Sequence, residues 1–198
     1  MVEGGSGAGA ALLCLAVRVP GIRGLGVELD PDLTAMAQAN AAASNVDGVS
    51  FVAADLLTLT PPGVFDHAMA NPPYHPAAGT ASPRPARELA KRARPGLLRD
   101  WTATLAALLR HRGTLTLILP AASLPEALNA LHTARCTPTS VLPLWPTVGR
   151  KAKLILLHGV KDGRAPLQLL PGLVLHATTG GFTPETEAVL RDAAAIRL

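Results

Sequence analysis

The sequence contains little cysteine, few aromatic residues and little charge. Two cysteines, Cys14 and Cys136, cannot build a disulfide framework and have no metal-ligand spacing, so their apolar surroundings predict packing roles. Charges and prolines interrupt every hydrophobic stretch, and the absence of a run of 18 apolar residues excludes a membrane-spanning helix. With 48% hydrophobic and 16% charged residues, the composition also excludes a disordered chain.

The length and the first residues of the chain indicate one domain and a cytoplasmic location. A chain of 198 residues can build one hydrophobic core but not two full domains, so residues 1–198 are expected to form a single domain. The uncharged segment 4–17 follows Glu3 instead of a basic stretch, which is not the pattern of a secretory signal. The six histidines form no metal-binding spacing, and we expect no metal site.

Basic residues exceed acidic ones by four, and they concentrate in two places. One window of sixteen residues has Glu88 as its only acid and holds a third of all the basic residues, namely Arg84, Arg87, Lys91, Arg92, Arg94 and Arg99. A second cluster consists of Arg150, Lys151 and Lys153. Such clusters are either solvated surface or contacts to a polyanion such as RNA, and the charge pattern by itself leaves both interpretations open.

Short apolar runs alternate with helical patterns, which is typical of a parallel sheet covered by helices. The expected strands are 25–29, 49–53, 65–70 and 115–119, then an antiparallel pair, 141–144 and 154–159, and a strand within 167–176 that prolines and glycine interrupt. The expected helices are 10–17, 31–40 or beyond, 98–111, one opened by a capping box at Ser123 and Glu126, and one from Pro184. The sequence therefore predicts an α/β fold.

A glycine-rich segment lies between Glu3 and the first expected helix. Gly5, Gly7 and Gly9 lack side chains, so the backbone can approach a ligand closely at the helix N-terminus. With Ala10 the spacing also satisfies the dinucleotide fingerprint. The loop therefore predicts a nucleotide-type ligand, and it fits NAD and S-adenosylmethionine equally well.

Two further carboxylates follow expected strands. Glu28 lies about twenty residues after the loop, where an acid can bind ribose hydroxyls. Asp55 follows the strand 49–53, where it can accept a hydrogen bond from an adenine amino group or cap a loop. The carboxyl ends of parallel strands meet at one edge of a sheet, so Glu3, Glu28 and Asp55 together predict a ligand site at that edge.

The tetrad Asn71-Pro72-Pro73-Tyr74 comes directly after the strand 65–70. A conjugated amino or amide nitrogen must become pyramidal before it attacks a methyl group. The side-chain oxygen of Asn71 and the carbonyl of Pro72 can each accept one N–H of such a nitrogen, while the prolines hold the backbone extended. Tyr74 can stack on a base that has been flipped out. The tetrad therefore predicts methyl transfer to an exocyclic nitrogen.

The glycine loop, the strand-end acids and the tetrad together resemble the class I S-adenosylmethionine-dependent methyltransferases that modify planar nitrogen. Segments 82–87, 164–176 and 182–185 make the resemblance closest to the bacterial tRNA (valine) adenine-N6 methyltransferase family. The resemblance implies a Rossmann-like class I methyltransferase sheet and S-adenosylmethionine as the cofactor. It also implies the cofactor-binding residues Glu3, Gly5, Gly7, Gly9, Glu28, Asp55, Leu56 and Asn71 and the catalytic residues Asn71, Pro72, Pro73 and Tyr74.

A tRNA substrate would give the basic window a role, with Arg84, Arg87, Lys91, Arg92 and Arg94 contacting phosphates. The tetrad equally fits glutamine-N5 methylation of a protein such as a release factor, or guanine-N2 methylation of ribosomal RNA. An NAD oxidoreductase is disfavoured, because the sequence shows no evident acid or base to handle a hydride.

Only Met1 and Val2 precede Glu3, so the first, central strand is expected to be truncated and the chain to lack an N-terminal segment that relatives carry. A missing central strand would leave ladder groups unpaired and weaken both stability and cofactor binding. The sequence is therefore also compatible with a catalytically silent remnant that keeps the fold.

Overall fold

The computed structural model describes residues 1–60, 63–73 and 95–198. Within these ranges one sheet has the strand order β3-β2-β1-β4-β5-β7-β6-β8, and β9 also pairs with β6. The strands are β1 Val2–Gly4, β2 Gly24–Glu28, β3 Val49–Ala53, β4 Phe65–Ala70, β5 Leu109–Pro120, β6 Cys136–Trp145, β7 Leu154–Lys161, β8 Gln168–Leu169 and β9 Leu173–Val174. The helices are α1 Ala10–Arg18, α2 Pro31–Ala43, α4 Leu97–Leu108, α5 Leu124–Thr133 and α6 Pro184–Arg191, with short 3-10 turns at Leu56–Thr58 and Ala121–Ser123.

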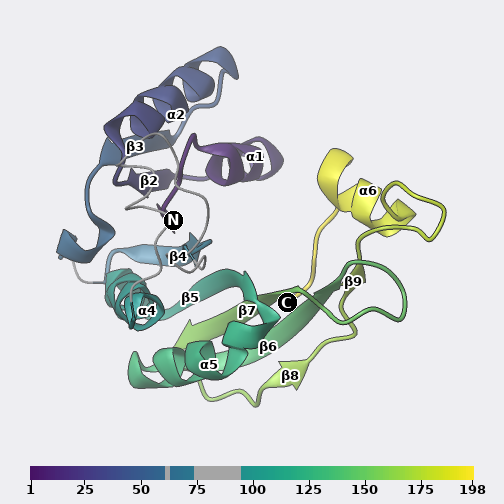
Figure 1. Ribbon diagram of the computed structural model, residues 1–198. Helices are drawn as coiled ribbons and strands as arrows, with labels where there is room; N and C mark the ends of the chain where they lie inside the picture. Colours follow the sequence, from purple (N-terminus) through teal and green to yellow (C-terminus); the bar gives the residue numbers. More distant parts are fainter. Residues whose placement is uncertain (61–62, 74–94) are drawn as a thin grey trace.

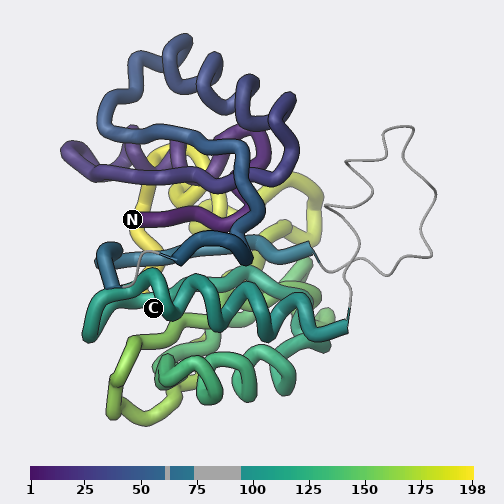
Figure 2. The backbone as a smooth tube through the Cα atoms, turned by 90° about the vertical axis from the view of Figure 1, so that its left-hand side faces the viewer, coloured from purple at the N-terminus to yellow at the C-terminus, as the bar shows by residue number. Residues whose placement is uncertain are grey.

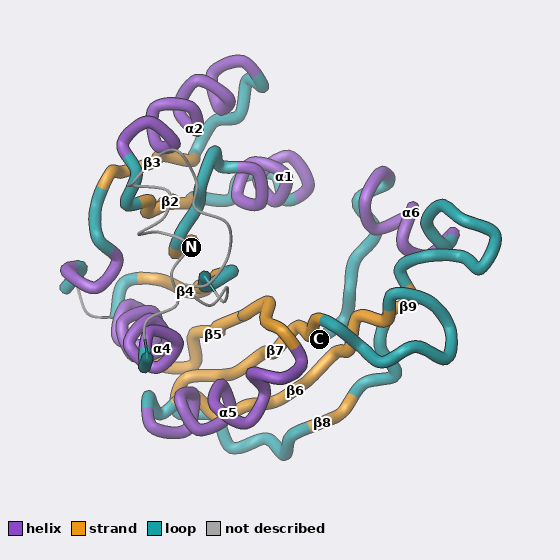
Figure 3. Tube along the Cα trace, viewed as in Figure 1, coloured by secondary structure: helices purple, strands orange, loops and turns teal. Residues whose placement is uncertain are grey.

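The sheet is mostly parallel, as expected. Strands β1 to β5 run in one direction, and β7 runs antiparallel between β5 and β6. Figure 1 and Figure 2 show α4 and α5 on one face of the sheet and α1 and α6 on the other, while Figure 3 shows the short strands β8 and β9 along the outer edge. The predicted Rossmann-like α/β fold is confirmed.

The core is divided by the sheet. Leucines of α4 and α5 pack against β5, β6 and β7 on one face, with Leu105, Leu115 and Leu157 fully buried. On the other face α1 and α2 meet over Phe51 of β3. Burial of this apolar surface supplies the main driving force for the fold. No helix within the described residues is both long and apolar enough to cross a membrane.

The central strand β1 is short but paired along its whole length. Val2, Glu3 and Gly4 align with Leu25, Gly26 and Val27 of β2 on one side, and with β4 on the other. Pairing on both sides lets three residues fill the centre of the sheet, because each backbone donor and acceptor finds a neighbouring strand. The expectation of unpaired ladder groups is therefore wrong for Val2 to Gly4, while residues 65–67 of β4 extend beyond the register that β4 shares with β1.

The predicted helix 98–111 is too long at its C-terminal end. The structure ends α4 at Leu108, and Leu109 already pairs with Phe65 as the first residue of β5. The Lys161 ammonium group fixes this transition, because it donates to the carbonyls of Ala106 and Leu109 at 2.7 Å each. A lysine near the last carbonyls of a helix donates hydrogen bonds to them and interacts favourably with the helix dipole.

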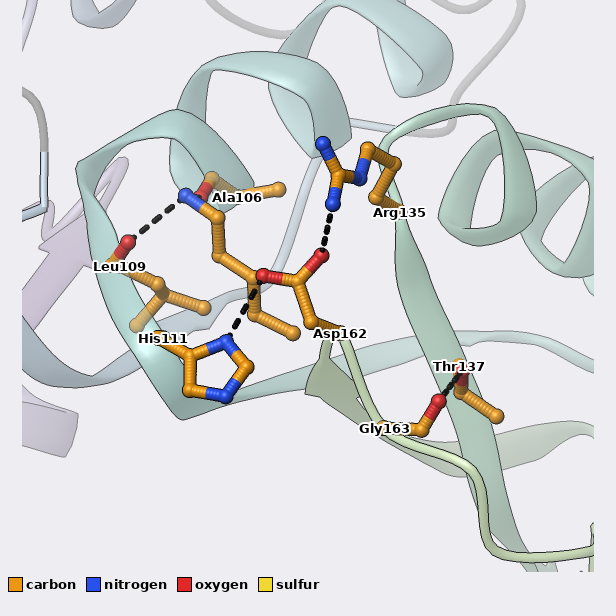
Figure 4. A network of polar contacts seen from close by, with 8 residues as sticks. Ala106, Leu109, His111, Arg135, Thr137, Asp162 and Gly163 are labelled. Carbon is orange, nitrogen blue, oxygen red and sulfur yellow. Dashed lines mark hydrogen bonds and ion pairs between the residues drawn. The ribbon is translucent and has the colours of Figure 1, made fainter.

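Figure 4 shows this lysine's neighbourhood at the amino edge of the sheet, where Arg135 and His111 both contact Asp162. The hydrogen bond from His111, with the positive charge of Arg135, lowers the pKa of the Asp162 carboxyl. The cluster joins the start of β5 and β6 to the end of β7. It lies at the opposite edge from the glycine loop and supports the fold there.

Three local predictions also need correction. The capping box at Ser123 does not form, because the preceding 3-10 turn already gives Ser123 helical dihedral angles and its side chain makes no capping bond. The expected strand 25–29 is shifted to Gly24–Glu28, since Leu29 turns away and is 47% exposed. Cys136 is buried, as predicted, but Cys14 is exposed on α1.

Candidate active site

The strand register brings the predicted site residues to one edge of the sheet. Gly4, the last residue of β1, aligns with Val27 of β2 and with Ala70 of β4. The next residues along these three strands are Gly5, Glu28 and Asn71. All three therefore leave the sheet at the same level, at the carboxyl edge where ligands of open α/β sheets bind.

The glycine loop makes a tight turn from β1 into α1. The N–H groups of Gly5 and Ser6 both donate to the carbonyl of Val27, at 2.8 and 3.1 Å. Gly5, Gly7 and Gly9 have φ angles of 68°, 54° and 85°, in the left-handed region that favours glycine. The turn therefore presents backbone N–H groups at the start of α1, which favours a ligand with acceptor oxygens.

The three glycines differ in what surrounds them. A Cβ at Gly5 would lie 2.7 Å from the ring of Trp101, and one at Gly9 would lie 2.8 Å from the ring of Phe51. A Cβ at Gly7 would meet no atom within 4 Å. Packing thus requires glycine at positions 5 and 9, whereas Gly7 faces open space.

We expect alanine substitutions at Gly9 and Gly7 to affect mainly stability and mainly cofactor binding, respectively. Gly9→Ala adds a clash with Phe51 to the strain of a positive φ, which should lower the free energy of unfolding by about 2–4 kcal/mol. Gly7→Ala adds strain alone, at about 1–2 kcal/mol, but its methyl group enters the open space and should weaken cofactor binding. Urea unfolding and calorimetric titration measure the two effects, and equal loss of stability in both variants would contradict this assignment.

Glu28 holds the loop from the neighbouring strand. Its Oε2 accepts from Gly7 N–H at 2.8 Å, and its Oε1 accepts from Asp30 N–H at 3.0 Å. The residue is only 6% exposed. Each carboxylate oxygen can accept a further bond, so the group can fix the loop and still receive a ligand hydroxyl.

Asn40 of α2 also supports the loop, and sequence reasoning missed it. Its side-chain amide donates to the carbonyl of Ala8 at 3.0 Å. The two residues are 32 positions apart, so no local pattern could have indicated the contact. Asn40 and Glu28 together fix the loop on both sides of Gly7.

Glu3 is a buried carboxylate under the loop. It is 6% exposed, and its Oε2 has no hydrogen-bond partner among residues 1–60, 63–73 and 95–198. Burial raises the pKa of Glu3 to about 7, a hydrogen bond from the Leu12 backbone partly opposes this, and the negative charge of Glu28 adds to it. Ser6 is buried beside the loop, and its hydroxyl also has no partner within the described residues.

The raised pKa of Glu3 predicts a pH-dependent stability. The ordinary value is 4.5, so between pH 4.5 and 7 the folded chain keeps a proton that the unfolded chain releases. This contribution is complete below pH 4.5 and is lost as the pH rises through 7, with a total of about 3 kcal/mol. We expect Glu3→Gln to flatten the curve of unfolding free energy between pH 5 and 8. Parallel curves for wild type and variant would contradict the assignment.

Asp55 and Leu56 follow β3 at the same edge. Asp55 is exposed, and its Oδ1 accepts from Leu57 N–H at 2.9 Å, so it caps the 3-10 turn that begins at Leu56. Within the described residues no hydrogen bond to its Oδ2 is formed. The side chain of Leu56 is 4% exposed and packs in the main core. A Cβ on Gly4 would lie 2.8 Å from Leu56, so this side chain packs directly beneath the end of β1.

Asn71, Pro72 and Pro73 follow β4. Asn71 is exposed, Pro72 is buried and Pro73 is half-buried. The exposed Asn71 therefore lies at the level of Gly5 and Glu28. The structure describes neither Tyr74 nor the basic residues expected to contact RNA, so these predictions lie outside the described residues: Tyr74, Arg84, Arg87, Lys91, Arg92 and Arg94.

The residues of the carboxyl edge fit the expected S-adenosylmethionine. A backbone loop with open space at Gly7, a carboxylate at the end of β2 and a second one after β3 match the polar groups of a nucleoside. The unpartnered oxygens of Glu3 and Ser6 lie under the same loop. Across the described ranges, His, Cys, Asp and Glu side chains form no group of three that could hold a metal ion.

Comparison with known proteins places this site in a family. The methyltransferase small domain model matches residues 1–105, which is more than half of the chain. A tRNA1(Val) (adenine(37)-N6)-methyltransferase of Porphyromonas gingivalis is 29% identical over 195 residues, which cover 91% of this chain and 74% of that protein.

Solved structures show the same fold. A predicted O-methyltransferase from Agrobacterium tumefaciens has a TM-score of 0.80 at 24% identity, over 98% of this chain and 90% of that one. Magnesium protoporphyrin IX methyltransferase from Synechocystis, solved with bound S-adenosylmethionine, has a TM-score of 0.58 at 18% identity, over 81% and 69%. With its glycine loop and strand-end acids at one edge, the chain belongs to the methyltransferase small domain family and is an S-adenosylmethionine-dependent methyltransferase.

Proposed function

We propose that this methyltransferase acts on the N6 amino group of an adenine in a tRNA. The observation that carries the proposal is the position of Asn71, exposed at the same edge and level as the glycine loop and Glu28. The relative in Porphyromonas gingivalis, named as a tRNA adenine-N6 methyltransferase, supports it.

Asn71 and Pro72 would hold the target nitrogen. The Asn71 side-chain oxygen accepts one N–H of the amino group and the Pro72 carbonyl accepts the other. These two acceptors favour the pyramidal nitrogen, whose lone pair is then free to attack. Pro72 and Pro73 limit the backbone to extended conformations, which keeps both acceptors in place. Tyr74 would stack on the flipped adenine.

The cofactor would lie along the glycine loop. Gly5, Gly7 and Gly9 let it approach the start of α1, Glu28 accepts from ribose hydroxyls and Asp55 accepts from the adenine amino group. Glu3 and Leu56 support the loop and the nucleoside from beneath. When bound, S-adenosylmethionine supplies a sulfonium methyl group, which bonds to the target nitrogen as its bond to sulfur breaks. The excess proton passes from the product nitrogen to water.

The charge distribution supports an RNA substrate. Arg150, Lys151 and Lys153 are exposed just before β7 at the carboxyl edge, and the sequence has no acid between Glu126 and Asp162. The window containing Arg84, Arg87, Lys91, Arg92 and Arg94 would add phosphate contacts after the tetrad. Phosphate contacts supply affinity and position the RNA without reading its sequence. A tRNA substrate would also place the reaction in the cytoplasm.

Transfer of a labelled methyl group tests this proposal. We expect label from S-adenosylmethionine to enter unmodified valine tRNA and not a purified release factor. Incorporation into the release factor with none in tRNA would replace the proposal by glutamine-N5 methylation. A chain that binds no cofactor by calorimetry and labels neither substrate would be a catalytically silent remnant.

A further inference from the structure

A cavity lies at the part of the sheet formed by β6 and β7. It has a volume of about 530 Å³, within the range of small-ligand pockets. It opens between the start of α5, the strands β6 and β7, and the chain that leads from β8 to β9. Its lining is almost entirely apolar and includes Leu124, Pro143, Trp145, Ala152, Ile155 and Leu170.

The cavity belongs to the same edge of the sheet as Asn71. Strand β6 runs parallel to β5, because both are antiparallel to β7, so Trp145 at the end of β6 lies at the carboxyl edge. Strands β5, β7 and β6 follow β4 in the sheet. At a strand spacing of about 4.8 Å, β7 and β6 lie about 10–15 Å from β4 across the sheet, a separation that a few nucleotides of one RNA strand can span.

Trp145 forms a fixed aromatic wall of the cavity. Its indole Nε1 donates to the carbonyl of Pro171 at 3.1 Å. A Cβ at Gly172 would lie 2.4 Å from the same nitrogen, so the chain packs directly against the ring. The ring is half-buried and held in one orientation. A fixed aromatic face is the feature on which proteins stack unpaired bases.

Three exposed cations are close in sequence to a residue that lines the cavity. Arg150, Lys151 and Lys153 are exposed and flank the lining residue Ala152. None of them makes an ion pair with a carboxylate in the described parts of the chain. Between Glu126 and Asp162 the sequence has no acid at all. The carbonyl of Lys153 accepts from Ala121 N–H at 2.9 Å, which fixes this loop to the start of α5.

We propose that this cavity binds an unstacked nucleobase of the RNA substrate, a few nucleotides from the target adenine, with the neighbouring phosphates on Arg150, Lys151 and Lys153. The inference rests on the proposed action on tRNA. The apolar walls and Trp145 match the faces of a base, and the cations match the charge on either side of it. The cavity would position the strand so that the target base enters at Asn71.

Variants of Trp145 and of the neighbouring cations test this inference. Trp145→Ala should weaken binding of an unmodified valine tRNA transcript about tenfold and raise KM for tRNA by a similar factor, with kcat within about twofold. Trp145→Phe keeps an aromatic face and should restore most of the affinity. Affinity for S-adenosylmethionine should not change, and thermal unfolding checks that each variant is folded.

Charge reversal at one of the three cations gives a readout that does not depend on Trp145. Lys151→Glu should reduce the slope of log Kd for tRNA against log salt by about one. Arg23→Glu is the matched control, because Arg23 is exposed just before β2 at the opposite edge of the sheet, and it should leave the slope unchanged.

The outcomes separate this inference from the proposed function. If wild type methylates tRNA but the Trp145 and Lys151 variants match it in KM and salt dependence, the cavity proposal is wrong and the proposed function stands. If wild type transfers no methyl group to tRNA but binds it in a way that depends on Trp145, the cavity proposal survives and the assigned reaction fails. A Trp145→Ala effect on a protein substrate with none on tRNA would make the occupant an apolar peptide side chain and overturn the nucleobase assignment.

Discussion

Asn71→Ala should lower the rate of methyl transfer at least about a hundredfold while S-adenosylmethionine still binds. The substitution removes one of two acceptors proposed to hold the target amino group, and loss of a single polar group that stabilises a transition state costs about 10²–10³ in rate. Asn71 is exposed after β4 and makes no hydrogen bond within the described residues, so the fold should not depend on it. Single-turnover transfer and calorimetric cofactor titration measure the two properties.

Asn129→Ala is the matched control for Asn71→Ala. Asn129 is exposed on α5, away from the carboxyl edge, and the same chemical change there should leave transfer intact. If Asn71→Ala turns over at the wild-type rate, the nitrogen is held by other groups. If it loses cofactor binding in parallel with transfer, Asn71 contributes to the cofactor site instead.

Glu28→Ala should lower both stability and cofactor affinity. The buried carboxylate accepts from Gly7 and Asp30, and hydrogen bonds to a charged group contribute more than neutral ones, so we expect a loss of about 2–4 kcal/mol in the free energy of unfolding. Affinity for S-adenosylmethionine should fall at least about tenfold, because the loop loses its support and the ribose its acceptor. Urea unfolding and calorimetry measure the two losses.

Two further variants serve as comparisons for the losses expected in Glu28→Ala. Glu28→Gln keeps one side-chain acceptor and should lose about half of the stability that Glu28→Ala loses. Glu126→Gln removes an exposed acid in the first turn of α5 and should cost under about 1 kcal/mol with no effect on cofactor binding. A Glu28→Ala variant that binds the cofactor as wild type does would remove Glu28 from the proposed site.

The sequence correctly predicted the helices and strands whose ends are set by neighbouring residues, such as capping side chains and turn residues. Asp30 caps α2 through its side chain, and Pro31 is the first residue of that helix, as the sequence indicated. Thr183 likewise caps α6. The strands Val49–Ala53 and Phe65–Ala70 were predicted with their observed bounds, because each apolar run is bounded by turn residues. Because Glu28, Asp55 and Asn71 end or follow predicted strands, the sequence also predicted that they lie at one edge of the sheet.

The sequence could not predict the features that depend on contacts between residues far apart in the chain. The end of α4 depends on Lys161, more than 50 residues away from the carbonyls that it binds. The support of the glycine loop by Asn40 and the orientation of Trp145 over Gly172 also depend on how separate segments pack. Glu3 was recognised as an acid beside the loop, but its burial and raised pKa follow from the helix and strands around it.

Nucleoside analysis of the product tests the assigned reaction most directly. Valine tRNA is incubated with this chain and S-adenosylmethionine carrying a labelled methyl group. The tRNA is then digested to nucleosides, and the labelled nucleoside is identified by mass spectrometry. We predict labelled N6-methyladenosine from the wild type and at most a trace from Asn71→Ala, with Asn129→Ala matching the wild type. Label on guanosine, or equal amounts of N6-methyladenosine from the wild type and Asn71→Ala, would contradict the role of the Asn71 and Pro72 oxygens in holding an adenine amino group.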